Sequence, residues 1–256
     1  MSLRVLVTND DGISSEGLRA LAGAAVAQGL EAVVAAPANE ASGSSAALTA
    51  VQAGGRIVVE RRTLEGLESV PAYAVAAAPA FISLIATRGA FGDAPQAVLS
   101  GINRGANVGN AILHSGTVGA ALTGCTQGRP GLAVSIASAK PQHWDTAAAI
   151  AGRVLPHLLA LDVPVVLNLN VPDVLTAEIR GIRQARLASF GAVQMTITEM
   201  GHGYVQLGVA THSEPEHEPD SDAGLLAAGY ATVTALQPIC EREDVELAEL
   251  AGLLGA

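Results

Sequence analysis

The start of the chain alternates between a strand pattern and a helix pattern, and this alternation limits the fold more than any other feature. Residues 3–8 form an apolar, β-branched run that is typical of a parallel strand covered on both faces. Ser14 or Ser15 can cap the helix that follows, and residues 31–36 form a second apolar run. A strand, a helix and a strand in this order predict a βαβ unit with a right-handed crossover.

The same alternation continues as far as residue 178. Further strands are predicted at 56–60, 72–75, 97–100, 132–136 and 165–170. Helices are predicted at 79–87, 117–127 and 145–159. Pro156 should disturb the last turn of the third of these helices. Alternating strands and helices indicate an α/β core with a mainly parallel sheet over residues 1–178.

The pattern changes after this core, and we predict an appendage over residues 179–256. Segments 194–198 and 204–209 alternate in polarity as the strands of an antiparallel hairpin do. The remaining predicted elements are an acidic loop at 211–222, a strand at 230–236 and an amphipathic helix at 241–254. The hairpin and the apolar surface of the terminal helix favour a homodimer.

Composition narrows the class of protein. The 256 residues fit one α/β domain, and the hydrophobic fraction of 50% with only 3% aromatics predicts a core of Ala, Val, Leu and Ile. A net charge of −10 argues against nucleic acid as the main partner. Cys125 and Cys240 form no CxxC pair, so neither a zinc site nor a disulfide framework is indicated. With no signal segment and no apolar run of about 18 residues, we expect a cytoplasmic protein with no membrane partner.

The first predicted strand ends in the loop Asn9-Asp10-Asp11-Gly12. Ligands of open α/β sheets bind beyond the carboxyl ends of the strands. Two adjacent carboxylates repel each other unless a cation or a shared proton intervenes, and hard divalent ions prefer such oxygen ligands. Taken alone, the loop fits a metal site and a helix-capping turn with surface acids equally well.

Two later loops also carry many polar residues. Residues 39–44 read Asn-Glu-Ala-Ser-Gly-Ser, which suits either a flexible connection or a site for a metal or a phosphate. Residues 100–110 contain three Asn and three Gly, which is unusual for a simple connection. Ser115, Gly116 and Thr117 then open a helix, and helix N-termini are anion sites.

Several familiar site motifs are missing from the sequence. It has no Gly-Lys-Ser/Thr of a Walker loop and no Gly-x-Gly-x-x-Gly after the first strand. It also lacks the Gly-x-Ser-x-Gly elbow of an α/β-hydrolase. The sequence therefore supports neither dinucleotide binding nor serine esterase chemistry.

Taken together, the three loops indicate a particular protein family much more specifically than any one loop does. The first is Asn-Asp-Asp-Gly, the second runs from Ala36 to Thr49, and the third is Ser-Gly-Ile-Asn-x-Gly-x-Asn-x-Gly-Asn continuing to Ser-Gly-Thr-Val-Gly-Ala-Ala over 100–121. With 168–172 and the Asp-Ser-Asp at 220–222, they resemble the stationary-phase survival nucleotidase family, SurE. The resemblance spans most of the chain. It implies a Rossmann-like three-layer core, with a hairpin and C-terminal segment that form dimers or tetramers.

The resemblance also implies an activity and a set of site residues. The expected reaction is hydrolysis of nucleoside 5'-monophosphates, and of 3'-monophosphates as a further substrate class, by a phosphatase that uses one divalent cation. All the implied metal ligands offer oxygen, which suits Mg²⁺ or Mn²⁺: Asp10, Asp11, Ser42 and Asn103. The implied phosphate-binding residues are Asn107, Ser115, Gly116 and Thr117. The catalytic set is Asp10, Asp11, Asn107 and Ser115, with Asn9, Gly43, Ser44 and His114 as further candidates.

The sequence departs from the family pattern in two places. Ala111 stands where many members have an acid, and the segment 76–82 lacks the usual polar residues. The neighbouring His114 replaces an aromatic residue and either protonates a leaving oxygen or lines a pocket wall. One of Asp10 and Asp11 acts as a base or as a nucleophile, and the sequence does not decide which. The rival functions are a phosphatase for polyphosphate or another ester and a non-catalytic nucleotide-binding homologue.

Overall fold

The computed structural model describes residues 2–189, 195–201, 204–209, 218–241 and 244. Its centre is a nine-stranded sheet in the order β10-β13-β9-β8-β7-β1-β2-β6-β5. The parallel strands are β1 (Arg4–Thr8), β2 (Glu31–Pro37), β6 (Ala72–Val75), β7 (Ala97–Arg104), β8 (Gly131–Ile136) and β9 (Val166–Val171). The predicted α/β fold with a mainly parallel sheet is confirmed.

Antiparallel strands flank this parallel centre. On one side β5 (Val59–Arg62) pairs with β6. On the other side β13 (Ala231–Leu236) pairs antiparallel with β9, and β10 (Ile182–Gln184) runs parallel to β13. Both β13 and β10 follow residue 178, so part of the predicted appendage completes the main sheet. The division at 178 stays a prediction.

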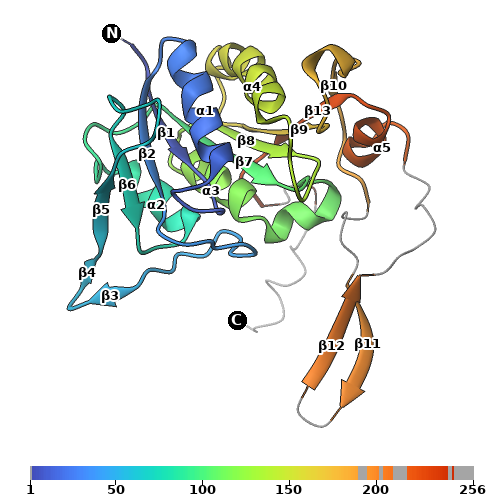
Figure 1. Ribbon diagram of the computed structural model, residues 1–256, viewed down its shortest axis with the longest axis horizontal. Coiled ribbons are helices and arrows are strands. Elements are labelled where there is room, and N and C mark those ends of the chain that lie inside the picture. Colours follow the sequence, from blue (N-terminus) through green and yellow to red (C-terminus); the bar gives the residue numbers. More distant parts are fainter. Residues whose placement is uncertain (1, 190–194, 202–203, 210–217, 242–243, 245–256) are drawn as a thin grey trace, which may run out of the picture.

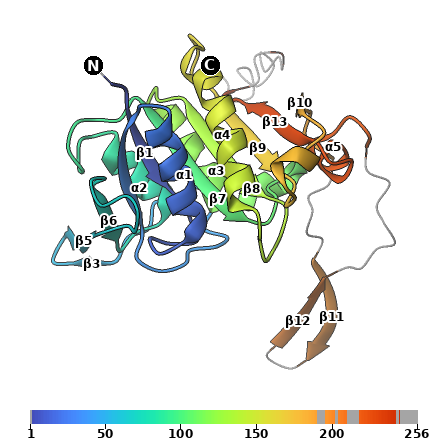
Figure 2. The same ribbon diagram turned by 45° about the horizontal axis from the view of Figure 1, so that its top comes forward.

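Helices cover both faces of the sheet and make three layers (Figure 2). The helices α1 (Glu16–Ala27) and α4 (Trp144–Leu159) lie side by side on one face, and α2 (Pro79–Ala86) and α3 (Gly116–Thr126) lie on the other. Strand β1 shows why both faces are apolar. Val5 and Val7 belong to the core beneath α1 and α4, whereas Leu6 between them faces the core beneath α2.

The remaining elements are short or lie at the edges. The predicted hairpin is confirmed as β11 (Met195–Gly201) and β12 (Tyr204–Val209), which lie apart from the main sheet in Figure 1. The sequence did not predict β10, α5 (Asp222–Ala227), η1 (Gly109–His114), η2 (Thr176–Glu178) or β3 (Gln52–Ala53), which pairs with β4 (Arg56–Ile57).

Some predictions need correction. The strand predicted at 56–60 is two elements, β4 and β5, and the loop predicted at 211–222 ends in the first residue of α5. The helix α4 continues through Pro156 to Leu159, because a proline in the last turn removes only one backbone hydrogen bond. The helix predicted at 241–254 lies outside the described residues, except for 241 and 244. No helix in the described part of the chain is long and apolar enough to cross a bilayer.

The strand order has a switch point between β1 and β7. From β1 the chain moves one way to β2 and β6, and then from β7 the other way to β8 and β9. Connections on the two sides diverge there, which leaves a crevice at the carboxyl ends of β1 and β7. The loops singled out in the sequence follow these strands and β2.

Candidate metal and phosphate site

The turn after β1 is built by Asn9. This side chain is fully buried, its Oδ1 accepts a hydrogen bond from the Gly12 amide at 3.1 Å, and its Nδ2 donates to the Gly12 carbonyl at 3.1 Å. Gly12 has a φ of +97°, a conformation that glycine adopts without strain. Asn9 thus shapes the turn that presents Asp10 and Asp11 at the switch point.

Asp10 is only 5% exposed, and its surroundings shift its pKa. Burial raises its pKa above the ordinary value, and the negative charge of Asp11 adds to the rise. The Thr117 hydroxyl donates a 2.5 Å hydrogen bond to Oδ1 of Asp10 and acts against these effects. A cation placed beside this carboxylate would remove the cost of its charge.

Asp11 belongs to a chain of polar contacts that reaches Ser42. Its Oδ1 accepts a 2.9 Å hydrogen bond from Nε of Arg104, and this contact raises the pKa of the guanidinium. The same guanidinium lies 3.5 Å from Glu40, which in turn accepts a 2.7 Å hydrogen bond from the Ser42 hydroxyl. The second oxygen of Asp11, Oδ2, is buried and has no hydrogen-bond partner.

Asn103 owes its position to a β-bulge in β7. Ser100 pairs with Ala133 of β8, but Asn103 pairs with Ser135, so one extra residue is inserted between them. The Asn103 amide nitrogen donates to the carbonyls of Arg104 and Gly105 at 3.2 and 2.8 Å. Because these bonds use its Nδ2, the side chain keeps its Oδ1 as an oxygen ligand.

The loop after β2 closes over the start of α3. The Ala41 amide donates a 2.7 Å hydrogen bond to the Asp10 carbonyl, which ties this loop to the turn after β1. Ser44 Oγ is buried without a hydrogen-bond partner. A Cβ atom on Gly116 would lie 2.7 Å from this Oγ and 2.8 Å from Asp10 Oδ2. Only a glycine at position 116 leaves room between these oxygens.

The N-terminus of α3 points its first amides into the same space. Ser115 is its N-cap, and its Oγ accepts a 3.1 Å hydrogen bond from the Val118 amide. Thr117 directs its hydroxyl to Asp10, and its backbone N–H also acts on this carboxylate; both contacts lower the pKa of Asp10. First-turn amides have no partner within a helix and favour negative charge. Next to this cap, His114 is exposed, and so are Ser42 and Gly43 in the facing loop.

Asn107 is fixed to the sheet by three side chains. Its amide donates to Asn170 Oδ1 at 2.8 Å, and its carbonyl accepts from Asn168 and Asn170 at 2.8 and 2.9 Å. Its own Nδ2 donates to Ser135 Oγ at 2.8 Å. Asn168 and Asn170 are fully buried in β9. The loop after β7 is therefore attached to β8 and β9 of the sheet through Asn107.

The donor set fits a hard divalent cation. Two carboxylates, an amide oxygen and hydroxyls lie on the loops and strand ends of the neighbouring strands β1, β7 and β2, and two of these oxygens, Asp11 Oδ2 and Ser44 Oγ, are buried without partners. Within the described ranges, no three His, Cys, Asp or Glu side chains gather as a metal site. A cation here would depend on neutral oxygens from Ser and Asn in addition to Asp10 and Asp11, which suits Mg²⁺ or Mn²⁺.

An open pocket of about 490 Å³ adjoins the site. One wall is the loop that carries Ser42, Gly43 and Ser44, and the other is the end of β6 with residues 76–78. The second wall is made of three alanines, where the family pattern has polar residues. The pocket can therefore accept an apolar ring beside the polar site.

Sequence reasoning missed five residues that shape the site. The sequence places Arg104 and Glu40 within loop motifs but assigns them no role. It places Ser135, Asn168 and Asn170 within predicted strands, again without a role. The signal for the last two was available, because two asparagines alternate with apolar residues in a buried strand. Buried amides need partners, which indicates a polar attachment.

Comparisons with known proteins identify the family. A family model described as "Survival protein SurE" matches residues 5–192. The 5'-nucleotidase SurE of Synechococcus sp. (strain JA-3-3Ab) is 38% identical over 244 residues, which cover 92% of each chain. The 5'-nucleotidase SurE of Nitrosococcus oceani is 33% identical over 240 residues, which cover 92% of this chain and 91% of that protein.

A solved structure extends the likeness to three dimensions. The crystal structure of the SurE protein from Aquifex aeolicus matches with a TM-score of 0.76 and 26% sequence identity. The match covers 98% of this chain and 99% of that chain. The likeness therefore includes the segments after residue 178 as well as the core.

Proposed function

The chain belongs to the SurE family, and from this membership we propose that it is a metal-dependent 5'-nucleotidase. Its substrates are nucleoside 5'-monophosphates, and its products are a nucleoside and inorganic phosphate. The observation that carries this proposal is the meeting of Asp10, Asp11 and the N-terminus of α3 at the switch point of the sheet. Acidic oxygens for a cation and the first turn of a helix, which favours an anion, lie side by side there.

Four residues would hold the cation: Asp10, Asp11, Ser42 and Asn103. Ser44 is a further candidate, since its buried Oγ lacks a partner. When bound, Mg²⁺ or Mn²⁺ would neutralise phosphoryl oxygens and acidify a water molecule. Thr117 fixes the rotamer of Asp10 through the hydrogen bond to Oδ1, so the carboxylate is oriented before substrate arrives.

The phosphate would lie against the first turn of α3. The backbone amides of Gly116 and Thr117 donate to its oxygens, and Asn107 adds a side-chain donor from the sheet side. The Gly116 position excludes a side chain, which lets the phosphate approach Asp10. The adjoining pocket beside Ser42 receives the nucleoside, whose base packs on the alanines of residues 76–78.

The experiment measures phosphate release from a panel of nucleoside 5'- and 3'-monophosphates and polyphosphate, with Mn²⁺, with Mg²⁺ and with a chelator. The wild-type protein should release phosphate from 5'-monophosphates only with metal. Asp10→Asn should lower this rate by at least about 100-fold, because it removes a charged ligand beside the phosphate. Asp162→Asn, an exposed acid distant in sequence from the three loops, is the matched control.

Two results would contradict the proposal. Full activity of Asp10→Asn, with Mn²⁺ affinity unchanged by calorimetry, would overturn the site assignment. A wild-type protein that releases phosphate from polyphosphate alone, or from no compound tested, would overturn the substrate class.

We also propose that the chain works as a homodimer or homotetramer in the cytoplasm. The strands β11 and β12 pair only with each other among the described strands. An isolated two-stranded hairpin is marginal in water, so it needs another surface to pack against, and a second copy supplies one. Cys125 and Cys240 are both free thiols, which agrees with a reducing compartment.

A further inference from the structure

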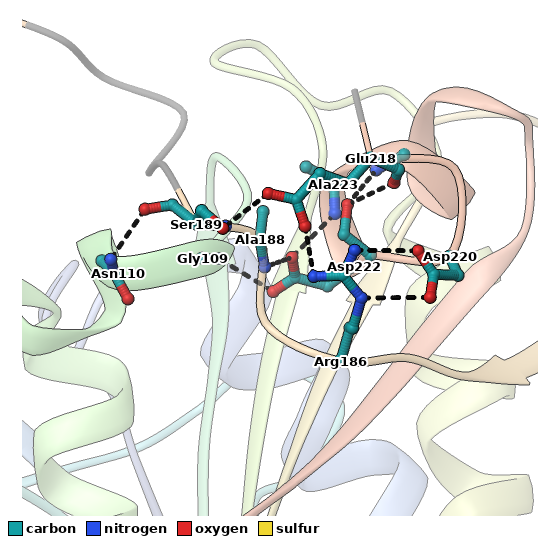
Figure 3. A network of polar contacts seen from close by, with 11 residues as sticks. Gly109, Asn110, Arg186, Ala188, Ser189, Glu218, Asp220, Asp222 and Ala223 are labelled. Carbon is teal, nitrogen blue, oxygen red and sulfur yellow. Dashed lines mark hydrogen bonds and ion pairs between the residues drawn. The ribbon is translucent and has the colours of Figure 1, made fainter. Parts of the chain in front are cut away.

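A buried carboxylate lies outside the proposed site, on the far side of the phosphate-binding loop. Asp222, the first residue of α5, is fully buried, and the proposed reaction gives it no role. Burying a charge is costly unless hydrogen bonds compensate for it. The contacts of this carboxylate show what it holds (Figure 3).

Three backbone amides donate to Asp222. Oδ1 accepts from Ala188 at 2.9 Å and from Ala223 at 2.8 Å, and Oδ2 accepts from Gly109 at 2.8 Å. Ala223 is its own neighbour, but Ala188 and Gly109 belong to segments far away in sequence. One carboxylate therefore joins α5, the segment after β10 and the loop after β7.

The contact with Gly109 matters because of the position of this glycine. It lies two residues after Asn107 and begins η1, which leads directly to the N-cap of α3. Asn107 is fixed from the sheet side by Ser135, Asn168 and Asn170. Asp222 fixes the next turn from the opposite side, so the loop is held at two points.

A second contact joins the same segments at the surface. Asn110 donates a 2.7 Å hydrogen bond from Nδ2 to the carbonyl of Ser189. Ser189 donates to Glu218 at 3.2 Å, and Arg186 binds both carboxylate oxygens of Asp220 at 2.9 and 3.0 Å. Residues 186–189 precede the hairpin in the chain and residues 218–222 follow it, so these pairs join the two described segments on either side of the hairpin in sequence.

From this geometry we propose that Asp222 is a positioning residue, which latches the phosphate-binding loop to α5 and to the segment after β10 and keeps Asn107 and the start of α3 in register. The inference rests on the proposed function for its effect on catalysis. Its structural part, the hold on Gly109, is independent of any substrate.

The test compares Asp222→Asn with Asp220→Asn. The amide of an asparagine can accept from Ala188 and Ala223 through one oxygen, but its NH₂ group then faces the Gly109 N–H, and the bond to the loop is lost. Asp220 lies in the same turn and has no bond to the loop, so its replacement is the matched control.

Hydrogen exchange measured by mass spectrometry gives the first result. In Asp222→Asn, peptides covering residues 105–115 should exchange at least about tenfold faster, while the strands of the sheet remain protected. Kinetics give the second result. The KM for the nucleotide should rise at least fivefold because Asn107 binds phosphate before reaction, whereas the Kd for Mn²⁺ should stay unchanged. A merely structural role would reduce the fraction of folded enzyme and leave KM as it is.

The outcomes separate this proposal from the proposed function. Unchanged exchange over 105–115, or faster exchange spread over the whole chain with an unchanged KM, would overturn the latch. If the wild-type protein released no phosphate, the proposed function would fail, yet the exchange comparison would still decide the latch. If Asp222→Asn does not fold, Asp222→Glu replaces it, because the longer side chain keeps the charge but moves the carboxylate away from the three backbone amides. Faster exchange over 105–115 in that variant supports the latch, and wild-type exchange overturns it.

Discussion

Asp10 and Asp11 are neighbours in the chain, but their surroundings differ. Asp10 is held by a neutral hydroxyl, and burial raises its pKa. Asp11 is paired with the guanidinium of Arg104, whose side chain is 44% exposed. The site thus already contains one cation supplied by the chain, which pairs with Oδ1 of Asp11 and leaves Oδ2 without a partner.

Replacing Arg104 should therefore strengthen metal binding. In Arg104→Ala, Asp11 loses its positive partner, and the site becomes more negative. We expect the Kd for Mn²⁺, measured by calorimetry, to fall by up to about 5-fold, since a partly exposed ion pair contributes up to about 1 kcal/mol. Arg88→Ala, an exposed arginine at the other end of the sheet, should leave the Kd unchanged. Weaker Mn²⁺ binding in Arg104→Ala would show that Arg104 supports the metal site and does not compete with it.

At the scale of single elements, close packing decides which residues a helix accepts. The helix α1 lies against both α4 and β7, and it contains two interior glycines in different surroundings. A Cβ on Gly17 would lie 2.1 Å from the Ile102 carbonyl and 2.7 Å from the Trp144 ring, whereas a Cβ on Gly23 would meet nothing within 4 Å. Ile102 lies in the bulge of β7 that positions Asn103, so Gly17 also protects the geometry of the site.

The same substitution should have opposite effects at these two positions. Gly23→Ala should raise the free energy of unfolding by about 0.5–1 kcal/mol, because alanine favours the helix. Gly17→Ala should lower it by about 1–3 kcal/mol, since the backbone of β7 must move. Urea unfolding of both variants checks this, and each serves as the control for the other. A change of the same sign in both would contradict the packing of α1 on β7.

At the scale of the whole molecule, the order of the strands explains the site. Asp10 follows β1, Asn103 ends β7 and Ser42 follows β2, and these strands are neighbours in the sheet. The strand β13, which follows the hairpin in the chain, pairs antiparallel with β9. Asn168 and Asn170 of β9 are therefore held between β13 and β8 in the sheet. The hairpin itself pairs with no other described strand.

This arrangement predicts an assembly in solution. Small-angle scattering at micromolar concentration should give a particle mass of at least about twice the 25.7 kDa of one chain. In a dilution series, the particle mass should fall toward the mass of one chain at the concentration where the assembly dissociates. A particle of 25.7 kDa at every concentration would refute the homodimer and the homotetramer alike.

The sequence was sufficient for the elements of the core and for the family. Apolar runs and caps predicted β1, α1 and β2, with Ser15 as the observed cap, since these signals are local. The resemblance to SurE is confirmed by the family match and by relatives that cover most of the chain. The roles of Ser42, Asn103 and the other site residues stay predictions. Short elements such as α5 and η1 were missed because they form only against their neighbours.

The sequence by itself determined the longer strands and helices of the core and the oxygen-rich residue types at the strand ends, because periodicity and short motifs depend only on neighbouring positions. Only the tertiary structure decided which of these residues meet. It brought Gly116 against Asp10 and Ser44, Arg104 against Asp11, and Asp222 against Gly109. Such contacts depend on the strand order and on the packing of distant segments, which no local pattern specifies.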